Sequence, residues 1–135
     1  MPAGRTAFVQ AQNDRYKDAQ ALLRAERWGG AIYLGGYAVE CLLKARILKR
    51  KGSSDLPREY WHHDLLRLMD VSGVAWDIKL PKNSAVQDQM LLITGTWDVT
   101  MRYGSTQFTN RHEANHFLEA IRKVRRWLQN SLRNH

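Results

Sequence analysis

Seven residues near the end of the chain, NRHEANH at positions 110–116, hold its densest set of side chains capable of chemistry. His112 and His116 are four residues apart, which places their imidazoles one turn apart on one face of a helix. With Glu113 they form the pattern H-E-x-x-H, in which two histidines bind zinc and the glutamate acts as general base. The same segment also contains an arginine, Arg111, followed by four residues and then His116. It therefore has two competing interpretations, of which at most one applies.

A catalytic zinc ion needs a third protein ligand besides the two histidines. Residues 117–135 contain one side-chain carboxylate, Glu119, and it lacks the spacing found in the common zinc protease classes. His135 is the terminal residue, and His63 is better explained as a helix cap or a packing residue than as a ligand. A small basic helical domain is also the wrong setting for a zinc protease. We therefore interpret the H-E-x-x-H match as coincidence and expect no metal and no cofactor.

The element around which the chain is organised is the apolar stretch 28–51. At about 100 degrees per residue this stretch is apolar almost all the way round, so the other helices should pack around it. Glu40 and Lys44, spaced i,i+4, mark the one line expected to face solvent. These two charges and Arg46 argue against a membrane span. A row of small residues should allow close approach of a neighbouring backbone: Ala31, Gly35, Ala38 and Ala45.

The remaining segments predict further helices and no β-sheet, because no run alternates polar and apolar residues. Asn110 followed by Glu113 predicts the start of the last helix. The predicted elements are a helix over 6–26 capped by Thr6, a break at 27–30, a short helix from 63 that stops near Gly73, a surface loop over 76–83, a helix over 84–103 and a helix over 111–132. We therefore expect an all-α fold, an antiparallel four-helix bundle with an additional short helix, forming one domain over 1–135.

The chain carries 21 Lys and Arg against 13 Asp and Glu, a formal net charge of +8. Such a surface attracts polyanions, of which nucleic acid is the commonest in the cytoplasm. Part of the excess charge lies at the end of 28–51 and in the last helix, where cations also suit the helix dipole, so a structural account stays open. The one cysteine, Cys41, is expected to be a buried hydrophobe. With no signal-peptide-like core in residues 1–15, we expect a cytoplasmic protein.

Four stretches carry a pattern that spans most of the chain. They are GGYAVECLLKA at 35–45, His63-Asp64-Leu65, Trp97 followed by Met101-Arg102-Tyr103, and Glu113-Ala114 with Phe117-Leu118. Together they resemble the HEPN family, small all-α domains of prokaryotes and higher eukaryotes named for a nucleotide-binding association. Arg111, the polar residue His112 and then His116 also resemble the ribonuclease signature of that family, which stands at the start of the last helix.

This resemblance implies a metal-independent endoribonuclease of toxin or defence type. RNA supplies its own nucleophile, the 2′-hydroxyl, so the enzyme must remove that proton, stabilise charge on the phosphorane and protonate the leaving 5′-oxygen. We expect His116 to transfer protons, Arg111 to hold the phosphate and His112 to support them. The expected products carry 2′,3′-cyclic phosphate and 5′-hydroxyl ends. Further substrate contacts are predicted at Arg102, Tyr103 and Asn110.

Arg111 and His116 are about 140 degrees apart around a helix, so they do not share a face. Arg111 can escape this by swinging outward from the first helical position. The resemblance implies another solution, in which two subunits pair and their motifs converge in one interfacial cleft, so we expect a homodimer.

In toxins of the family that are silenced by a nucleotidyltransferase, a tyrosine two residues after the motif histidine is nucleotide-modified. Here that position is Leu118, so we do not expect control by such modification, although a nucleotidyltransferase or another antitoxin stays a candidate partner.

Other interpretations remain open. The chain is alternatively a non-catalytic HEPN module that binds a nucleotide or a nucleotidyltransferase, or a structural subunit whose basic face anchors a nucleoprotein assembly. Residues 111–116 are then an ordinary solvated helix start, and Arg102 with Tyr103 merely closes the third helix. Cleavage of RNA would distinguish the endoribonuclease from the binding module and the structural subunit. None of the three interpretations involves a membrane.

Overall fold

The computed structural model describes residues 4–97 and 110–133. Within these ranges the chain is helical and contains no strand, which confirms the all-α prediction. The α-helices are α1 (Arg5–Arg24), α2 (Trp28–Lys51), α3 (Leu65–Val71), α4 (Val74–Asp77), α5 (Ser84–Thr96) and α6 (Arg111–Arg133), and two 3₁₀ turns, η1 (Arg58–Tyr60) and η2 (Pro81–Asn83), stand before α3 and α5.

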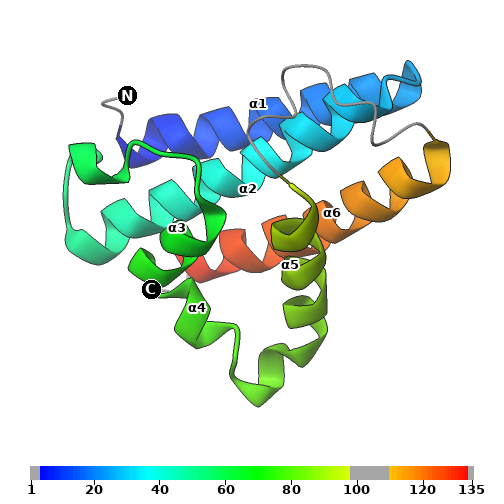
Figure 1. Cartoon of the computed structure of the whole chain (residues 1–135). Coiled ribbons are helices and arrows are strands. Elements are labelled where there is room, and N and C mark those ends of the chain that lie inside the picture. Colours follow the sequence, from blue (N-terminus) through cyan, green and yellow to red (C-terminus); the bar gives the residue numbers. More distant parts are fainter. Residues whose placement is uncertain (1–3, 98–109, 134–135) are drawn as a thin grey trace.

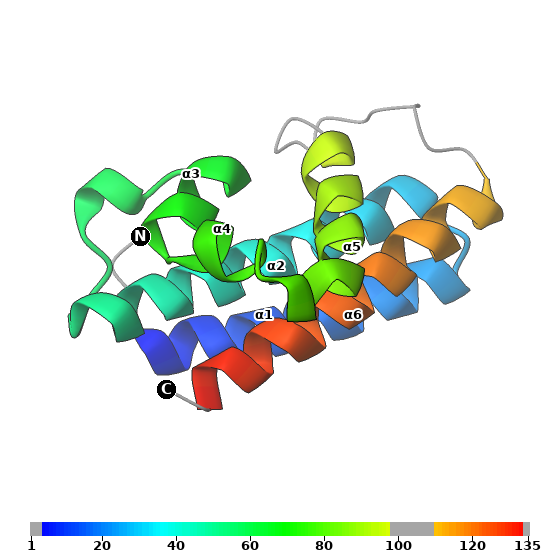
Figure 2. The same cartoon turned by 90° about the horizontal axis from the view of Figure 1, so that it is seen from below.

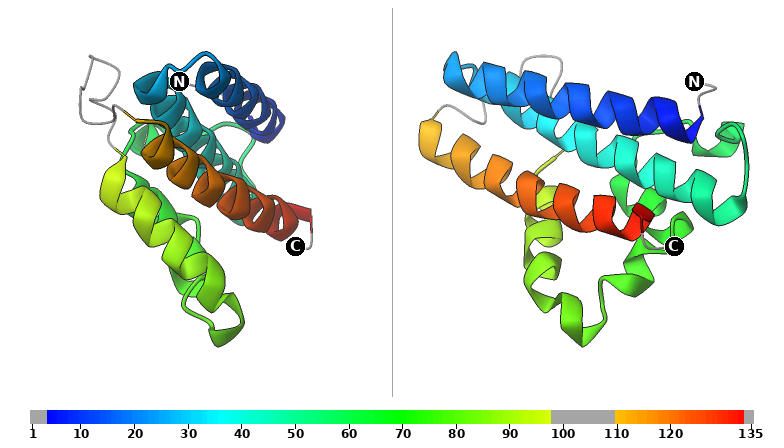
Figure 3. Two further views of the ribbon diagram at one scale, coloured as in Figure 1. Left: turned by 90° about the vertical axis from the view of Figure 1, so that its right-hand side faces the viewer. Right: turned by 180° about the vertical axis from the view of Figure 1, so that it is seen from behind.

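The three long helices α1, α2 and α6 lie side by side along the length of the molecule (Figure 1). α1 and α2 run antiparallel, as their tight connection predicts, and Glu26 in that connection has a positive φ of 62°. α6 runs alongside α2 in the same direction, so the carboxyl ends of these two helices meet (Figure 3). α5 crosses α6 at a steep angle, while α3 and α4 pack near the carboxyl end of α2 (Figure 2).

Helix α2 covers the whole apolar stretch 28–51, including residues 28–30 that were expected in the break before it, and is buried along most of its length. The small-residue row does allow close approach, because the position of a Cβ on Gly35 lies only 2.7 Å from Cδ2 of Leu118 in α6. The neighbouring Gly36 was not part of that row, yet its Cβ position lies 2.1 Å from Cδ1 of Trp97. Glycine at 35 and 36 therefore lets α6 and the end of α5 reach the backbone of α2.

The expectation that Glu40 and Lys44 face solvent is wrong. Their side chains are only 1% and 9% exposed, and Lys44 donates to the Glu40 carboxylate at 2.9 Å inside the protein. The segment after α2 folds back over this line and places His63 against Glu40. The i,i+4 spacing thus identified the Glu40–Lys44 pair correctly. Its burial could not be predicted from the sequence of α2 alone, because a later segment of the chain covers it.

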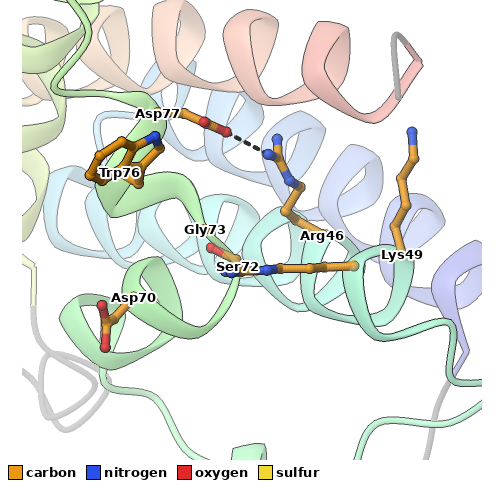
Figure 4. A pocket seen from close by; sticks show the side chains of 8 residues that line it. Arg46, Lys49, Asp70, Ser72, Gly73, Trp76 and Asp77 are labelled. Carbon is orange, nitrogen blue, oxygen red and sulfur yellow. Dashed lines mark hydrogen bonds and ion pairs between the residues drawn. The ribbon is translucent and has the colours of Figure 1, made fainter.

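The basic end of α2 holds the carboxyl ends of three other helices. Arg46 pairs with Asp77 at the end of α4 at 2.5 Å, as Figure 4 shows, and also donates to Ser131 in α6. Lys49 donates to the carbonyl of Leu132 in α6, and Arg50 donates to the carbonyl of Val71 in α3 at 3.1 Å. Lys49 and Arg50 thus satisfy carbonyls that helix ends leave without partners, whereas Arg46 binds the side chains of Asp77 and Ser131. Contacts with helix ends therefore explain the cations of this cluster without a polyanion. Arg46, Lys49 and Arg50 also line a cavity of about 580 Å³.

Several boundaries differ from those expected. α1 begins before Thr6, so its N-cap is Gly4, and Thr6 caps nothing because it lies inside the first turn. The break before α2 is residues 25–27, and Trp28 already belongs to the helix. The region 76–83 is no simple loop, because α4 and η2 interrupt it. α5 ends at Thr96, since Trp97 has extended backbone angles, and residues 98–103 of the predicted helix lie outside the described part of the chain.

Among the described residues, no helix combines the length and the apolar character that crossing a membrane requires.

We predict that Gly36→Ala destabilises the protein by roughly 1–3 kcal/mol through overpacking. The new methyl meets the ring of Trp97, and that ring is fixed by a 2.9 Å hydrogen bond from its Nε1 to the carbonyl of Tyr33. Chemical denaturation measures the loss. Gly95→Ala is the matched control, because its methyl meets nothing within 4 Å, and we expect it to stabilise α5 by roughly 0.5–1 kcal/mol. Equal effects of the two substitutions would contradict the close approach.

A second prediction concerns the thiol of Cys41, which is 2% exposed. Burial raises the pKa of this thiol to about 12, above the value near 8.5 of an unfolded cysteine. The folded state therefore holds the proton more tightly, and its advantage is full below pH 8.5 and declines as the pH rises towards 12. We expect a disulfide reagent to label the native protein at pH 7 only as fast as the protein opens. Rapid labelling of the folded protein would contradict this burial.

Candidate functional site

Asn110 fixes the start of α6. Its side-chain oxygen accepts a hydrogen bond from the backbone N–H of Glu113 at 2.8 Å, so the predicted N-cap is confirmed. Arg111 consequently occupies the first helical position, and His112 the second. The side chain of Asn110 is used in this cap, which positions the motif residues that follow it.

The guanidinium of Arg111 turns towards the corner between α1 and α2. It forms an ion pair with Glu26 and lies 5.5 Å from the centre of the Trp28 ring. The side chains of Arg111 and Glu26 are 65% and 62% exposed, so water screens this pair strongly. Arg111 is therefore held only loosely and is accessible from solvent.

His112 and His116 line an open groove between α1 and α6. Their rings are almost parallel, with 7° between the planes and 6.5 Å between the centres, as the one-turn spacing predicts. The groove has a volume of about 550 Å³ and is lined by Tyr16, Gln20 and Leu23 of α1 and by His112, Asn115, His116, Leu118, Glu119 and Arg122 of α6. Arg111 does not line it. Within one chain the structure thus brings the two histidines together in this groove, while Arg111 binds Glu26 outside its lining.

The groove contains a cation that the sequence analysis did not single out. Arg122 donates to both carboxylate oxygens of Glu119, with Nε 3.1 Å from Oε2. This hydrogen bond is the main reason why the pKa of Glu119 is lowered and that of Arg122 is raised. The i,i+3 spacing of Glu119 and Arg122 is visible in the sequence, but their place beside His116 depends on how α1 packs on α6.

Next to the groove, Arg125 is a structural residue. It lies 3.9 Å above the Tyr16 ring and donates from Nε to the buried side chain of Gln12 at 2.9 Å. Burial lowers the pKa of Arg125, while the Tyr16 hydroxyl opposes that effect. This contact connects α6 to α1 and fixes one wall of the groove.

Two further predicted residues, Arg102 and Tyr103, lie outside the described part of the chain. Leu118, which stands where silenced toxins carry the modified tyrosine, is 6% exposed and packs at Gly35. In residues 4–97 and 110–133, no third His, Cys, Asp or Glu joins His112 and His116 in a group that could hold a metal ion.

We predict that Arg111→Ala changes the free energy of unfolding by less than about 0.5 kcal/mol, because its ion pair is exposed. Arg125→Ala is the contrasting variant, and we expect a loss of roughly 1–2 kcal/mol since it removes packing on Tyr16 and leaves Gln12 without its partner. Denaturant titration of both variants tests this difference. A large loss in Arg111→Ala would show that this arginine holds the fold together and would disqualify it as a probe of function.

The family model described as HEPN domain matches residues 8–131, nearly the whole chain. No curated protein and no solved structure matches this chain.

Proposed function

Because the chain belongs to the HEPN family, we propose that it is a metal-independent endoribonuclease of toxin or defence type, cytoplasmic, whose active site is completed by a second copy. In this proposal residues 1–135 are one domain, and α1, α2, α5 and α6 are the four helices of its HEPN-type bundle. The observation that supports it best is the pair of stacked, exposed histidines, His112 and His116, in an open groove beside the first turn of α6.

The chemistry uses groups that are accessible in this groove. One imidazole takes the proton of the RNA 2′-hydroxyl, the 2′-oxygen attacks phosphorus, and the 5′-oxygen leaves with a proton from an acid. His116 carries the main proton transfer, and His112, 6.5 Å away centre to centre, supports it. A guanidinium fork stabilises charge on the phosphorane oxygens. The products carry 2′,3′-cyclic phosphate and 5′-hydroxyl ends.

The separation of Arg111 from the groove is the reason for a homodimer. Arg111 is about 140 degrees from His116 around α6 and does not line the groove, so in this proposal a phosphate near His116 meets the Arg111 of a second copy more readily than the one in its own chain. The exposed ion pair with Glu26 is weak, and a phosphate replaces it at little cost. Each subunit then contributes its arginine to the histidines of the other.

The position of Arg111 outside the α1–α6 groove also favours one alternative function. In this alternative the protein is a non-catalytic HEPN module that binds a nucleotide or a nucleotidyltransferase partner. If no second copy supplies the arginine, the groove has histidines and no Arg111, and the protein binds without turnover. The apolar groove between α3, α4 and α5 is the surface that this rival would use, because Leu66 and Leu91 on it are 63% and 64% exposed.

The experiment is cleavage of RNA by the purified protein in excess EDTA. We expect cleavage to cyclic-phosphate ends that falls at least 100-fold in Arg111→Ala and in His116→Ala, a loss in the range typical of a missing proton-transfer or oxyanion-stabilising group. Arg133→Ala, an exposed cation at the far end of α6, is the control and keeps its activity. No cleavage, or cleavage unaffected by either substitution, would contradict the ribonuclease proposal and favour the non-catalytic binding module.

A further inference from the structure

A second group of titratable side chains lies away from the α1–α6 groove and has no part in the proposed cleavage. Glu40 is 1% exposed, accepts from Lys44 at 2.9 Å, and has both carboxylate oxygens 3.0 Å from Nδ1 of His63. The carboxylate only accepts hydrogen bonds, so Nδ1 of His63 carries the proton and donates it. The other ring nitrogen, Nε2, is then a hydrogen-bond acceptor in the neutral imidazole. A buried pair thus fixes both the orientation and the tautomer of a half-exposed histidine.

His63 forms part of a cavity of about 590 Å³ between the segment before α3 and the end of α5. Its lining residues are Trp61, His62, His63, Asp64, Leu65, Leu66, Thr94 and Trp97. The indole N–H of Trp61 donates to the carbonyl of Leu56 at 2.8 Å, and that of Trp97 donates to the carbonyl of Tyr33 at 2.9 Å. Both rings are therefore held in place without a ligand, and neither has its donor free. Trp61 is 38% exposed, whereas Trp97 is 7% exposed and stacks on Tyr33, so Trp61 offers most of the aromatic surface. Preformed aromatic walls lower the ordering entropy that a ligand would otherwise have to offset.

The wall also contains a polar atom without a partner. Nδ1 of His62 accepts from the backbone N–H of Asp64 at 3.1 Å, so in the neutral ring the proton is on Nε2. Burial lowers the pKa of His62, which favours that neutral ring. Nε2 is buried and has no hydrogen-bond partner among the described residues. Native proteins rarely keep such a donor unpaired without a reason.

The charges around the cavity limit what it binds. Among its lining residues neither Lys nor Arg is present, and the one carboxylate, Asp64, accepts the N–H of Arg67 as the N-cap of α3. None of these lining residues offers a cation to a phosphate or carboxylate; the Arg58 guanidinium lies over the Trp61 ring, 5.5 Å from its centre. A neutral, flat ring would find the exposed aromatic surface of Trp61, a smaller part of Trp97, and an acceptor, Nε2 of His63.

We propose that this cavity is a second binding site, which takes a neutral planar heteroaromatic ring and receives a ring N–H on Nε2 of His63. Guanine and uracil have this chemistry, since each carries a ring N–H beside at least one ring carbonyl. The site lies apart from His112 and His116, so it does not depend on whether the α1–α6 groove cleaves RNA.

The test titrates uridine and guanosine into the ¹⁵N-labelled protein and follows the indole N–H signals of its five tryptophans by NMR. We expect saturable shifts of Trp61 and Trp97, with Trp28, Trp76 and Trp127 unmoved. 3-Methyluridine and 1-methylguanosine are the matched ligands, because each lacks the ring N–H, and we expect them to bind at least tenfold more weakly. No shift at either indole up to about 10 mM nucleoside, an affinity weaker than most specific sites, would overturn the proposal.

Two variants locate the interaction. His63→Ala removes the acceptor and leaves Glu40 paired with Lys44, so the fold is kept, and we expect at least a tenfold loss of affinity. Thr94→Phe fills the cavity while the Glu40–His63 pair remains, and we expect it to abolish binding. His116→Ala, which changes the other groove, leaves binding unaltered whether or not the protein cleaves RNA. Binding that persists in both His63→Ala and Thr94→Phe, or equally strong binding of the methylated ligands, would contradict the site.

Discussion

The enclosure of helix α2 is the constraint on which the rest of the structure depends. An almost wholly apolar helix must be covered on every side, and α1, α6, α3 and the end of α5 supply that cover. Gly35 and Gly36 determine how closely the cover fits, since Leu118 and Trp97 occupy the space that side chains would need. The positions of α6 and of Trp97 are therefore consequences of α2, and both candidate sites derive their geometry from them.

Enclosure also determines which charges are available for binding. Glu40 and Lys44 pair with each other inside the protein, and the cations that end α2 bind helix carboxyl ends or Asp77. A net charge of +8 thus overstates the basic surface that a polyanion can meet. The exposed face of α6 keeps cations that are not committed in this way, among them Lys123 and Arg126. That face continues from His112 and His116, so electrostatic attraction and the histidine groove belong to one side of the molecule.

The sequence predicted what depends on one helix at a time. The carboxyl end of α2, the cap of α6 by Asn110 and the stacking of His112 on His116 all follow from local periodicity and spacing. Predictions from the sequence were wrong or incomplete where a residue's environment depends on a segment distant in the chain. The burial of Glu40 depends on His63, which is 23 residues away, and the groove beside His116 depends on Tyr16, which comes from another helix. The early end of α5 is a third case, because Trp97 leaves the helix to reach Tyr33 and Gly36.

The central claim is that Arg111 and His116 act together although one chain keeps them apart. The most direct measurement mixes Arg111→Ala and His116→Ala subunits in equal amounts after each has been shown to be inactive alone. If subunits exchange freely and each site is shared, half of the dimers are mixed and each has one intact site, so about a quarter of wild-type cleavage returns. A mixture that stays inactive, although exchange into mixed dimers is demonstrated, would contradict the shared site.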